Sequence, residues 1–167
     1  FYDLKQAQTL NNVAKQIKKI VKIHLEIDTG VSRTGILPQK ALNFIKQLTK
    51  YQYLELEGIC SHFASGEDNP KYTYYQLNKF KNLINNLEYN QIYIPLKHFA
   101  CTASTILYRE SILSGIRLGI GLYGLHDNKD IEQRIKLKPA LSWYTTILQI
   151  KELPPKTKIG YGGTYTT

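Results

Sequence analysis

The chain has 167 residues, a length that suffices for one domain or for one domain and part of a second. Its hydrophobic content of 43% and its 13 tyrosines fit a packed globular protein and exclude an intrinsically disordered one. The formal charge of +9 would suit a nucleic-acid partner, but the lysines are scattered and no arginine-rich run or aromatic ladder accompanies them. A solvated basic surface is therefore the favoured interpretation.

The cysteines and the apolar segments bear on the setting of the protein. Cys60 and Cys101 form neither a disulfide framework nor a CxxC motif, so we expect a reducing compartment. No segment is long and apolar enough to predict a membrane span. The chain begins with Phe1 and contains no methionine, so we expect a fragment or a processed piece of a longer protein.

The first part of the chain predicts a helix, a strand and a second helix. Asp3 can cap a helix whose apolar residues recur at helical spacing. Residues 21–28, VKIHLEID, alternate aliphatic and polar side chains, which is typical of a strand. Such a strand fits the interior of an enzyme barrel near its catalytic mouth, and it equally fits an ordinary half-exposed strand. The loop 29–35 carries Arg33, and Pro38 opens the next helix.

Two further strands continue the alternation. Residues 54–64, LELEGICSHFA, predict a strand with His62 near its end, and a helix follows the loop SGEDNP. Residues 92–103, IYIPLKHFACTA, predict a third strand that ends at Thr102 in a small-residue turn and a short helix. Strands that alternate with helices predict a parallel sheet, in which functional groups gather at the C-terminal ends of the strands. Arg33, His62 and Thr102 all lie at or just past such ends.

The glycine-rich stretch 115–124, GIRLGIGLYG, follows the third predicted strand and its short helix. Its period-two alternation predicts a strand with one aliphatic face and a second face that carries Arg117 and glycines. A glycine weakens a strand unless something must approach the backbone closely. An arginine on that face suggests an anionic or acceptor-bearing ligand, and a core strand with an incidental arginine is the alternative. The sequence HDNKD and a short charged helix follow.

The pattern changes near residue 137. Residues 140–151, ALSWYTTILQIK, form an extended run rich in β-branched and aromatic residues. LPPKT predicts a turn, and IGYGGTYTT at 159–167 predicts the returning strand. No helix intervenes, so residues 1–137 are expected to form one domain and residues 138–167 to begin an all-β region.

Several motifs in order resemble the alanine racemases, pyridoxal-phosphate enzymes that interconvert L- and D-alanine. They are IDTGVSRTGI, SHFAS, HFACTAS, IRLGIGLYG, LKPALSW and IGYGGTY. The resemblance implies an α/β chain that comprises the later half of a (β/α)8 TIM-like barrel, residues 1–137, and the first strands of a C-terminal all-β domain, residues 138–167. The lysine that carries the cofactor in this family lies upstream of residue 1, so no residue here takes that role.

The resemblance also implies a binding site for pyridoxal 5'-phosphate. Six residues match the family's cofactor-binding positions: Arg33, His62, Thr102, Arg117, Gly119 and Ile120. Arg33 would hydrogen-bond the cofactor's phenolic oxygen and help to place the substrate carboxylate, and His62 would pack against the pyridine ring. The hydroxyl of Thr102 would bind the phosphate, together with backbone N–H groups of Gly119 and Ile120.

Arg117 and a further residue, Tyr161, carry the chemistry that the resemblance implies. Arg117 would face the pyridine nitrogen, and because a guanidinium cannot accept a proton, that nitrogen should stay neutral, which would limit side reactions. Tyr161 matches the tyrosine that exchanges the α-proton on one face of the substrate, and the absent lysine serves the other face. Racemisation needs a base on each face. In the family this tyrosine reaches the partner subunit's site, which implies a head-to-tail homodimer.

Two positions depart from the family pattern. Glu26 stands where some members have a carboxylated lysine, and we expect it to neutralise charge beside Arg33. Cys101 replaces the asparagine that commonly precedes the phosphate-binding hydroxyl.

The resemblance implies a cytoplasmic alanine racemase that uses two-base proton exchange to supply D-alanine for bacterial peptidoglycan. We expect the 167-residue piece alone to be inactive and poorly soluble, because an open barrel exposes strand edges. The alternatives are a non-catalytic pyridoxal-phosphate barrel protein and a related barrel decarboxylase. The β region after residue 137 argues against the first. Arg117, where a decarboxylase is expected to place a carboxylate, argues against the second.

Overall fold

A parallel sheet forms the main body of the molecule. The computed structural model describes residues 1–126 and 128–167. The strands of this sheet lie in chain order: β1 (Val21–Glu26), β2 (Leu54–Cys60), β3 (Leu96–Cys101) and β4 (Gly115–Arg117). All three neighbouring pairs are parallel, so the chain must cross back between strands, as the alternation of strands and helices predicts.

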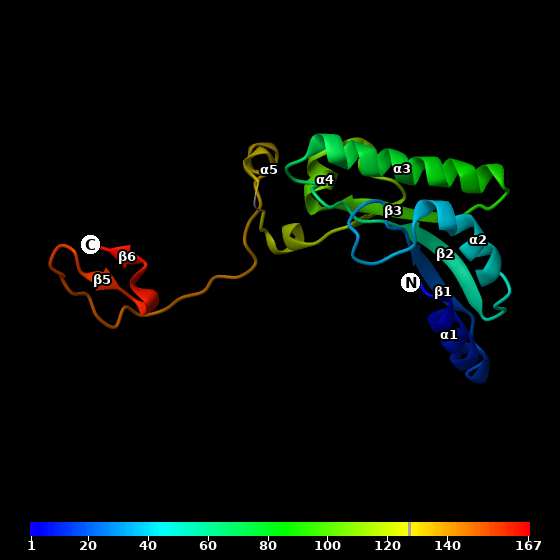
Figure 1. Ribbon diagram of the computed structural model, residues 1–167, viewed down its shortest axis with the longest axis horizontal. Coiled ribbons are helices and arrows are strands. Elements are labelled where there is room, and N and C mark those ends of the chain that lie inside the picture. The colour runs from blue at the N-terminus through cyan, green and yellow to red at the C-terminus, as the bar shows by residue number, and fades with distance from the viewer. Residues whose placement is uncertain (127) are drawn as a thin grey trace.

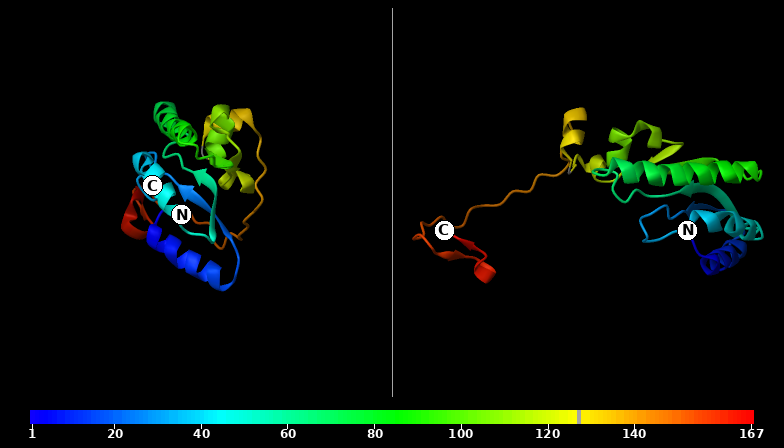
Figure 2. Two further views of the ribbon diagram at one scale, coloured as in Figure 1. Left: turned by 90° about the vertical axis from the view of Figure 1, so that its right-hand side faces the viewer. Right: turned by 45° about the horizontal axis from the view of Figure 1, so that its top comes forward.

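Three helices lie alongside the curved sheet, as Figures 1 and 2 show. They are α1 (Leu4–Gln16), α2 (Pro38–Leu48) and α3 (Pro70–Tyr89). Asp3 caps α1 by accepting the N–H of Lys5 at 2.7 Å, and prolines occupy the first positions of α2 and α3. The predicted starts of these helices are therefore confirmed. None of the described helices combines the length and the apolarity that a bilayer-spanning helix needs.

The core lies between these helices and one face of the sheet. Leu25, Ile59 and Phe99, from three different strands, are fully buried against α2 and α3. The alternate residues of β1, which include His24 and Glu26, point to the other face and are only partly buried. The sheet thus has an apolar face toward the helices and a polar face opposite.

The glycine-rich stretch forms a shorter strand than its alternation predicts. Strand β4 ends at Arg117, and residues Ile120–Tyr123 form a 3-10 turn, η2. The N–H groups of Gly119 and Gly121 donate to the side-chain oxygen of Thr102 and not to a neighbouring strand. A side-chain acceptor thus competes with the sheet ladder at this position and ends the strand. Strands β2 and β3 are also shorter than predicted.

Short helical elements lie on both sides of β4 in the chain, and an extended segment follows them. The helix α4 (Thr102–Leu107) and the turn η1 (Arg109–Ser111) precede β4, and α5 (Lys129–Arg134) follows it as the predicted short charged helix. An extended segment then leads to a small hairpin, as Figure 1 shows. The hairpin pairs β5 (Lys158–Ile159) with β6 (Tyr165–Thr166) in antiparallel fashion.

The predicted pairing of residues 140–151 with residues 159–167 is wrong. Residues 140–151 belong to no strand, and Trp143 and Leu148 are almost fully exposed. A strand needs a partner for its N–H and C=O groups, and the described residues supply none for this run. Residues 158–166 pair within themselves, around the turn η3 (Tyr161–Gly163).

Candidate active site

A pocket of about 210 Å³ lies where β2, β3 and β4 end, the edge at which the sequence places its candidate residues. Five of the six predicted cofactor residues line it: His62, Thr102, Arg117, Gly119 and Ile120. The rest of the lining comprises Glu67, Cys101, Ala103, His126 and Ile131. The structure therefore brings together residues from four separate segments, as the parallel topology predicts.

Thr102 lines the pocket together with Gly119. Its side-chain oxygen accepts the N–H of Gly119 at 3.0 Å and that of Gly121 at 3.3 Å. A Cβ on Gly121 would come within 2.4 Å of the Thr102 methyl group, whereas one on Gly119 would meet only an ordinary contact at 3.7 Å. The result is a small cup in which both N–H groups are paired with the Thr102 oxygen, whose own O–H can donate to an anion such as phosphate. Gly121 is not among the predicted cofactor-binding residues.

Cys101 flanks this cup. Its sulfur lies 3.4 Å from the hydroxyl of Ser104, and that hydroxyl also receives the backbone N–H of Cys101 at 2.9 Å. The side chain at this position therefore contributes to the cap of α4 as well as to the pocket lining.

His62 follows β2 and is held in place through its backbone. The carbonyl of His62 accepts a hydrogen bond from the fully buried amide of Gln76 on α3 at 3.1 Å. The same amide donates to Thr29, and Ser61 in turn bonds Thr29 at 2.8 Å. The pKa of His62 is lowered from its ordinary value, first by burial and then by the positive charges of Arg117 and Arg33. A neutral imidazole is the favoured form here.

Arg117 is the last residue of β4 and extends along the polar face of the sheet. One terminal nitrogen, Nη1, lies 3.4 Å from Nδ1 of His98 on β3. Cys60 at the end of β2 also faces this guanidinium, which partly offsets the rise that burial causes in the pKa of its thiol. Arg117 therefore has neighbours on two adjacent strands.

The pocket contains polar atoms that the protein does not satisfy. In the part of the chain that the structure describes, three buried side-chain nitrogens lack a hydrogen-bond partner: Nδ1 of His62, Nε of Arg117 and Nδ1 of His126. All three residues line this pocket. A buried polar atom left unpaired costs about 1–3 kcal/mol, so their convergence indicates a site for a polar ligand. No sequence pattern singled out His126, since it follows the glycine-rich stretch in an irregular loop.

Arg33 lies outside the pocket, on the loop after β1. Asp28 shapes this loop by accepting the N–H groups of Gly30 and Ser32 at 2.9 and 3.0 Å. Arg33 is exposed and shares a narrow crevice with Glu26 and His62. His62 therefore separates Arg33 from the pocket, because it lines both spaces.

Glu26 does not pair with Arg33 among the described residues, contrary to the expected neutralisation. Its carboxylate accepts the hydroxyl of Thr34 at 3.0 Å instead. Thr34 lies next to Arg33 in the chain, so the carboxylate orders the loop that carries the arginine. The charge of Glu26 is also felt at His62, where it opposes the lowering of the pKa.

Tyr161, the predicted base, is fully exposed in the turn η3 and is not part of the pocket lining. Its role remains a prediction.

The comparisons with known proteins agree with this arrangement. A family model described as alanine racemase, N-terminal domain, matches residues 1–127, about three quarters of the chain. The chain belongs to the alanine racemase family. It is 40% identical over 162 residues to an alanine racemase of Halothermothrix orenii, covering 96% of this chain and 43% of that protein.

Solved structures of alanine racemases share the fold. The alanine racemase of Clostridium difficile 630 has a TM-score of 0.83 and 34% identity, covering all of this chain and 44% of that one. A histidine racemase of Leuconostoc mesenteroides subsp. sake has a TM-score of 0.71 and 28% identity, covering 99% of this chain and 45% of that one. The chain is thus α/β, the later half of a (β/α)8 barrel followed by the first strands of an all-β domain. It spans less than half the length of the curated relatives that it matches.

Proposed function

We propose that the protein to which this chain belongs is an alanine racemase that uses pyridoxal 5'-phosphate and exchanges the α-proton of alanine between two bases. The observation that carries the proposal is the convergence of three unpartnered buried nitrogens on one pocket beside the Thr102 cup. Within the proposal, residues 1–137 belong to the barrel domain and residues 138–167 begin the β domain.

The donor set of the pocket fits this cofactor. The Thr102 hydroxyl and the N–H group of Ile120 would hold the phosphate, and the N–H of Gly119, which here donates to Thr102, would join them by turning to it. His62, kept neutral by burial, would lie against the ring. Arg117 would face the pyridine nitrogen. When bound, pyridoxal phosphate supplies an electron sink that acidifies the α-proton of the amino acid.

Three residues of the chain would determine the protonation of the ring, the binding of the substrate and the transfer of its α-proton. Arg117 carries a permanent positive charge and cannot supply a carboxylate to the ring nitrogen, which favours a neutral ring and suppresses transamination. Arg33, on the far side of His62, would bind the phenolic oxygen and the substrate carboxylate. Tyr161 would hold or deliver the proton on one face, in the site of a second subunit, and its full exposure here suits contact with such a partner.

The substrate is proposed to be alanine because the relatives cited are named alanine racemases at up to 40% identity. The likeness to a histidine racemase makes the amino acid a point to test. A supply of D-alanine to peptidoglycan and a cytoplasmic location remain predictions.

The test is racemisation of alanine by the full-length protein, as wild type, as Tyr161→Phe and as Tyr165→Phe. Tyr165 lies on β6 of the same hairpin, has no assigned role and is the matched control. We expect Tyr161→Phe to lose at least about 10²-fold in turnover while it keeps the cofactor's absorption band, the cost of a removed general base. Tyr165→Phe should keep its turnover. Cofactor binding without racemisation by the wild type would favour the non-catalytic pyridoxal-phosphate barrel protein or the barrel decarboxylase.

A further inference from the structure

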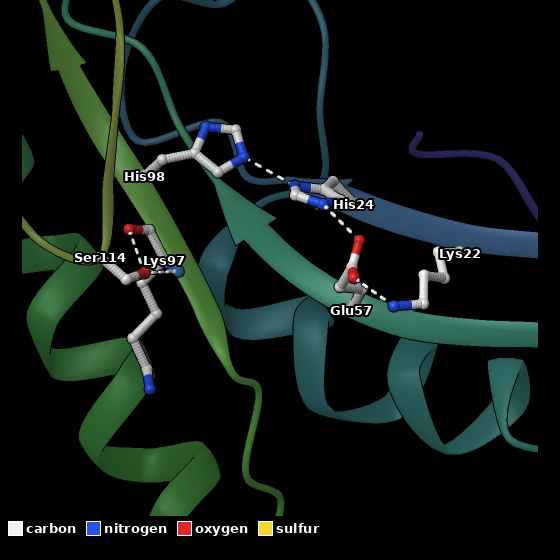
Figure 3. Close-up of polar contacts among 6 residues, drawn as sticks. All are labelled: Lys22, His24, Glu57, Lys97, His98 and Ser114. Atoms are coloured by element: carbon white, nitrogen blue, oxygen red, sulfur yellow. Dashed lines mark hydrogen bonds and ion pairs between the residues drawn. The ribbon is translucent and has the colours of Figure 1, made fainter.

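A line of hydrogen-bonded side chains crosses the polar face of the sheet and ends at Arg117. Figure 3 shows most of it: Lys22 contacts Glu57, Glu57 contacts His24, and His24 contacts His98. The distances are 2.7 Å for Lys22 Nζ to Glu57 Oε1, 3.4 Å for His24 Nε2 to Glu57 Oε2, and 2.7 Å for His24 Nδ1 to His98 Nε2. His98 Nδ1 then faces Arg117 Nη1 at 3.4 Å.

A glycine in β2 makes room for the hydrogen bond between His24 and His98. His24 on β1 and His98 on β3 are not on neighbouring strands, because β2 lies between them. The residue of β2 opposite His24 is Gly58, and a Cβ there would lie 2.4 Å from Nδ1 of His24. A glycine therefore leaves the room in which the histidine ring crosses the strand.

A second irregularity of β2 aims Glu57 at the same line. Ile23 pairs with Leu56 and His24 pairs with Gly58, so Glu57 is an extra residue that no residue of β1 opposes. Such a bulge redirects a side chain and is uncommon between parallel strands. Here it turns Glu57 toward Lys22 and His24. Two separate backbone features thus serve one hydrogen-bonded line.

The donors and acceptors fix the direction of the line. A guanidinium only donates, so Nδ1 of His98 must accept and the proton of His98 sits on Nε2. That N–H donates to Nδ1 of His24, which leaves the proton of His24 on Nε2, where it donates to the carboxylate of Glu57. In this arrangement of bonds each ring carries one proton, and every polar atom of the two imidazoles has a partner.

We infer that Glu57, His24 and His98 are positioning residues that hold the guanidinium of Arg117 toward the pocket, with Glu57 acting from two strands away. The inference rests on the proposed function, since Arg117 is taken to face the cofactor ring. The negative charge of Glu57 favours the tautomers in which the ring protons of His24 and His98 point toward it. The lone pair on Nδ1 of His98 then faces Arg117. Lys22 balances the charge of Glu57.

A purely structural line would behave differently. Cross-strand hydrogen bonds that only stabilise the sheet would contribute independently, and removal of the Glu57 charge would leave the environment of Arg117 as it was. If the side chains position Arg117, Glu57 acts on it only through His98. Replacement of Glu57 must then leave cofactor affinity unchanged once His98 is replaced by a side chain that accepts from Arg117 but does not bond His24.

The experiment is a double-mutant cycle on the full-length protein with Glu57→Gln and His98→Asn. Asparagine places an oxygen near the position of Nδ1, so it can accept from Arg117 but cannot relay from His24. The first readout is the dissociation constant of pyridoxal phosphate. The second is the ¹⁵N spectrum of histidine-labelled protein, which reports which ring nitrogen carries the proton. Glu55→Gln, an equal charge change at an exposed position of β2, is the control.

We expect Glu57→Gln to raise the dissociation constant about tenfold, as the loss of one hydrogen bond to a charged group does, and Glu55→Gln to leave it unchanged. In the His98→Asn protein, Glu57→Gln should have no further effect. His24 and His98 should both carry their protons on Nε2, and Glu57→Gln should shift the resonances of both rings.

Additive effects in the cycle, or a proton on Nδ1 of His98, would overturn the inference. Neither readout requires turnover, so a protein that binds the cofactor but does not racemise alanine would fail the proposed function while the cycle still decides the inference. A protein that binds no pyridoxal phosphate would overturn both.

Discussion

The backbone N–H of Gly119 donates a 3.0 Å hydrogen bond to the side-chain oxygen of Thr102, and this bond ties the segment after β4 to the first residue of α4. The two residues are far apart in the chain and belong to different strand–helix connections. Both residues line the pocket, so the pocket depends on a hydroxyl at position 102 and on the absence of side chains at the glycines that bond it.

Replacement of Thr102 by valine should weaken cofactor binding. Valine keeps the shape but removes the oxygen that accepts from Gly119 and Gly121 and that is proposed to contact the phosphate. A hydrogen bond to a charged group contributes about 1.5–3 kcal/mol, so the dissociation constant should rise roughly ten- to hundredfold. Titration of the full-length protein with pyridoxal phosphate measures it. Thr102→Ser should bind as the wild type does, and equal loss in both variants would refute the hydroxyl's role.

The two glycines of the cup should respond differently to alanine. A Cβ at Gly121 would overlap the Thr102 methyl group at 2.4 Å, so Gly121→Ala should lower the free energy of unfolding by about 1–3 kcal/mol. Gly119→Ala meets only an ordinary contact and should change stability by less than about 0.5 kcal/mol. Its methyl group should still hinder the phosphate and raise the dissociation constant. Urea unfolding of the apo-protein and cofactor titration separate the two effects, and equal stabilities of the two variants would contradict this account.

The sequence predicts much of this edge of the sheet because strand ends are readable from periodicity. The pattern places His62 and Thr102 at or just past strand ends and Arg117 on one face of the following strand, and the structure gathers the three around one pocket. The alternation of residues 115–124 nevertheless over-predicted β4, since periodicity does not register that a threonine from another segment will bind the backbone N–H groups.

Other features depend on contacts that a linear pattern does not contain. The relation of His24 to His98 requires the strand order and the bulge at Glu57, neither of which periodicity supplies. A glycine within a strand does signal close approach, so Gly58 could have drawn attention to this face. The irregular backbone of residues 140–151 has a different cause, because strand propensity cannot act without a partner to pair with.

Acidification should destabilise the protein through His62 and His98. The pKa of each is lowered in the folded state, that of His62 by burial and by Arg117 and Arg33, that of His98 by burial and by Arg117 and His24. The unfolded chain therefore binds more protons than the native one once the pH falls below about 6.5, so stability is full above that pH and declines as the pH falls toward the folded pKa values.

Thermal unfolding of the full-length protein between pH 7.5 and pH 5 measures this decline. The variants His62→Gln and His98→Asn each remove one of the two titrations and should flatten the profile relative to the wild type. A wild-type profile that rises on acidification, or variants that reproduce its slope, would show that other groups control the pH dependence.

The buried amide of Gln76 should prove essential for the position of His62. It donates to Thr29 and to the carbonyl of His62, each at 3.1 Å, and accepts the N–H of Ala64 at 2.9 Å. Gln76→Leu would leave these groups unpaired in a fully buried position, so the free energy of unfolding should fall by about 3 kcal/mol. The exposed Gln39→Leu on α2 is the control and should change it by less than about 0.5 kcal/mol. Because the lost bonds hold the segment that carries His62, the dissociation constant of pyridoxal phosphate should rise in Gln76→Leu even under conditions in which the protein is fully folded. A destabilised variant with unchanged cofactor affinity would show that α3 supports the fold without positioning the site.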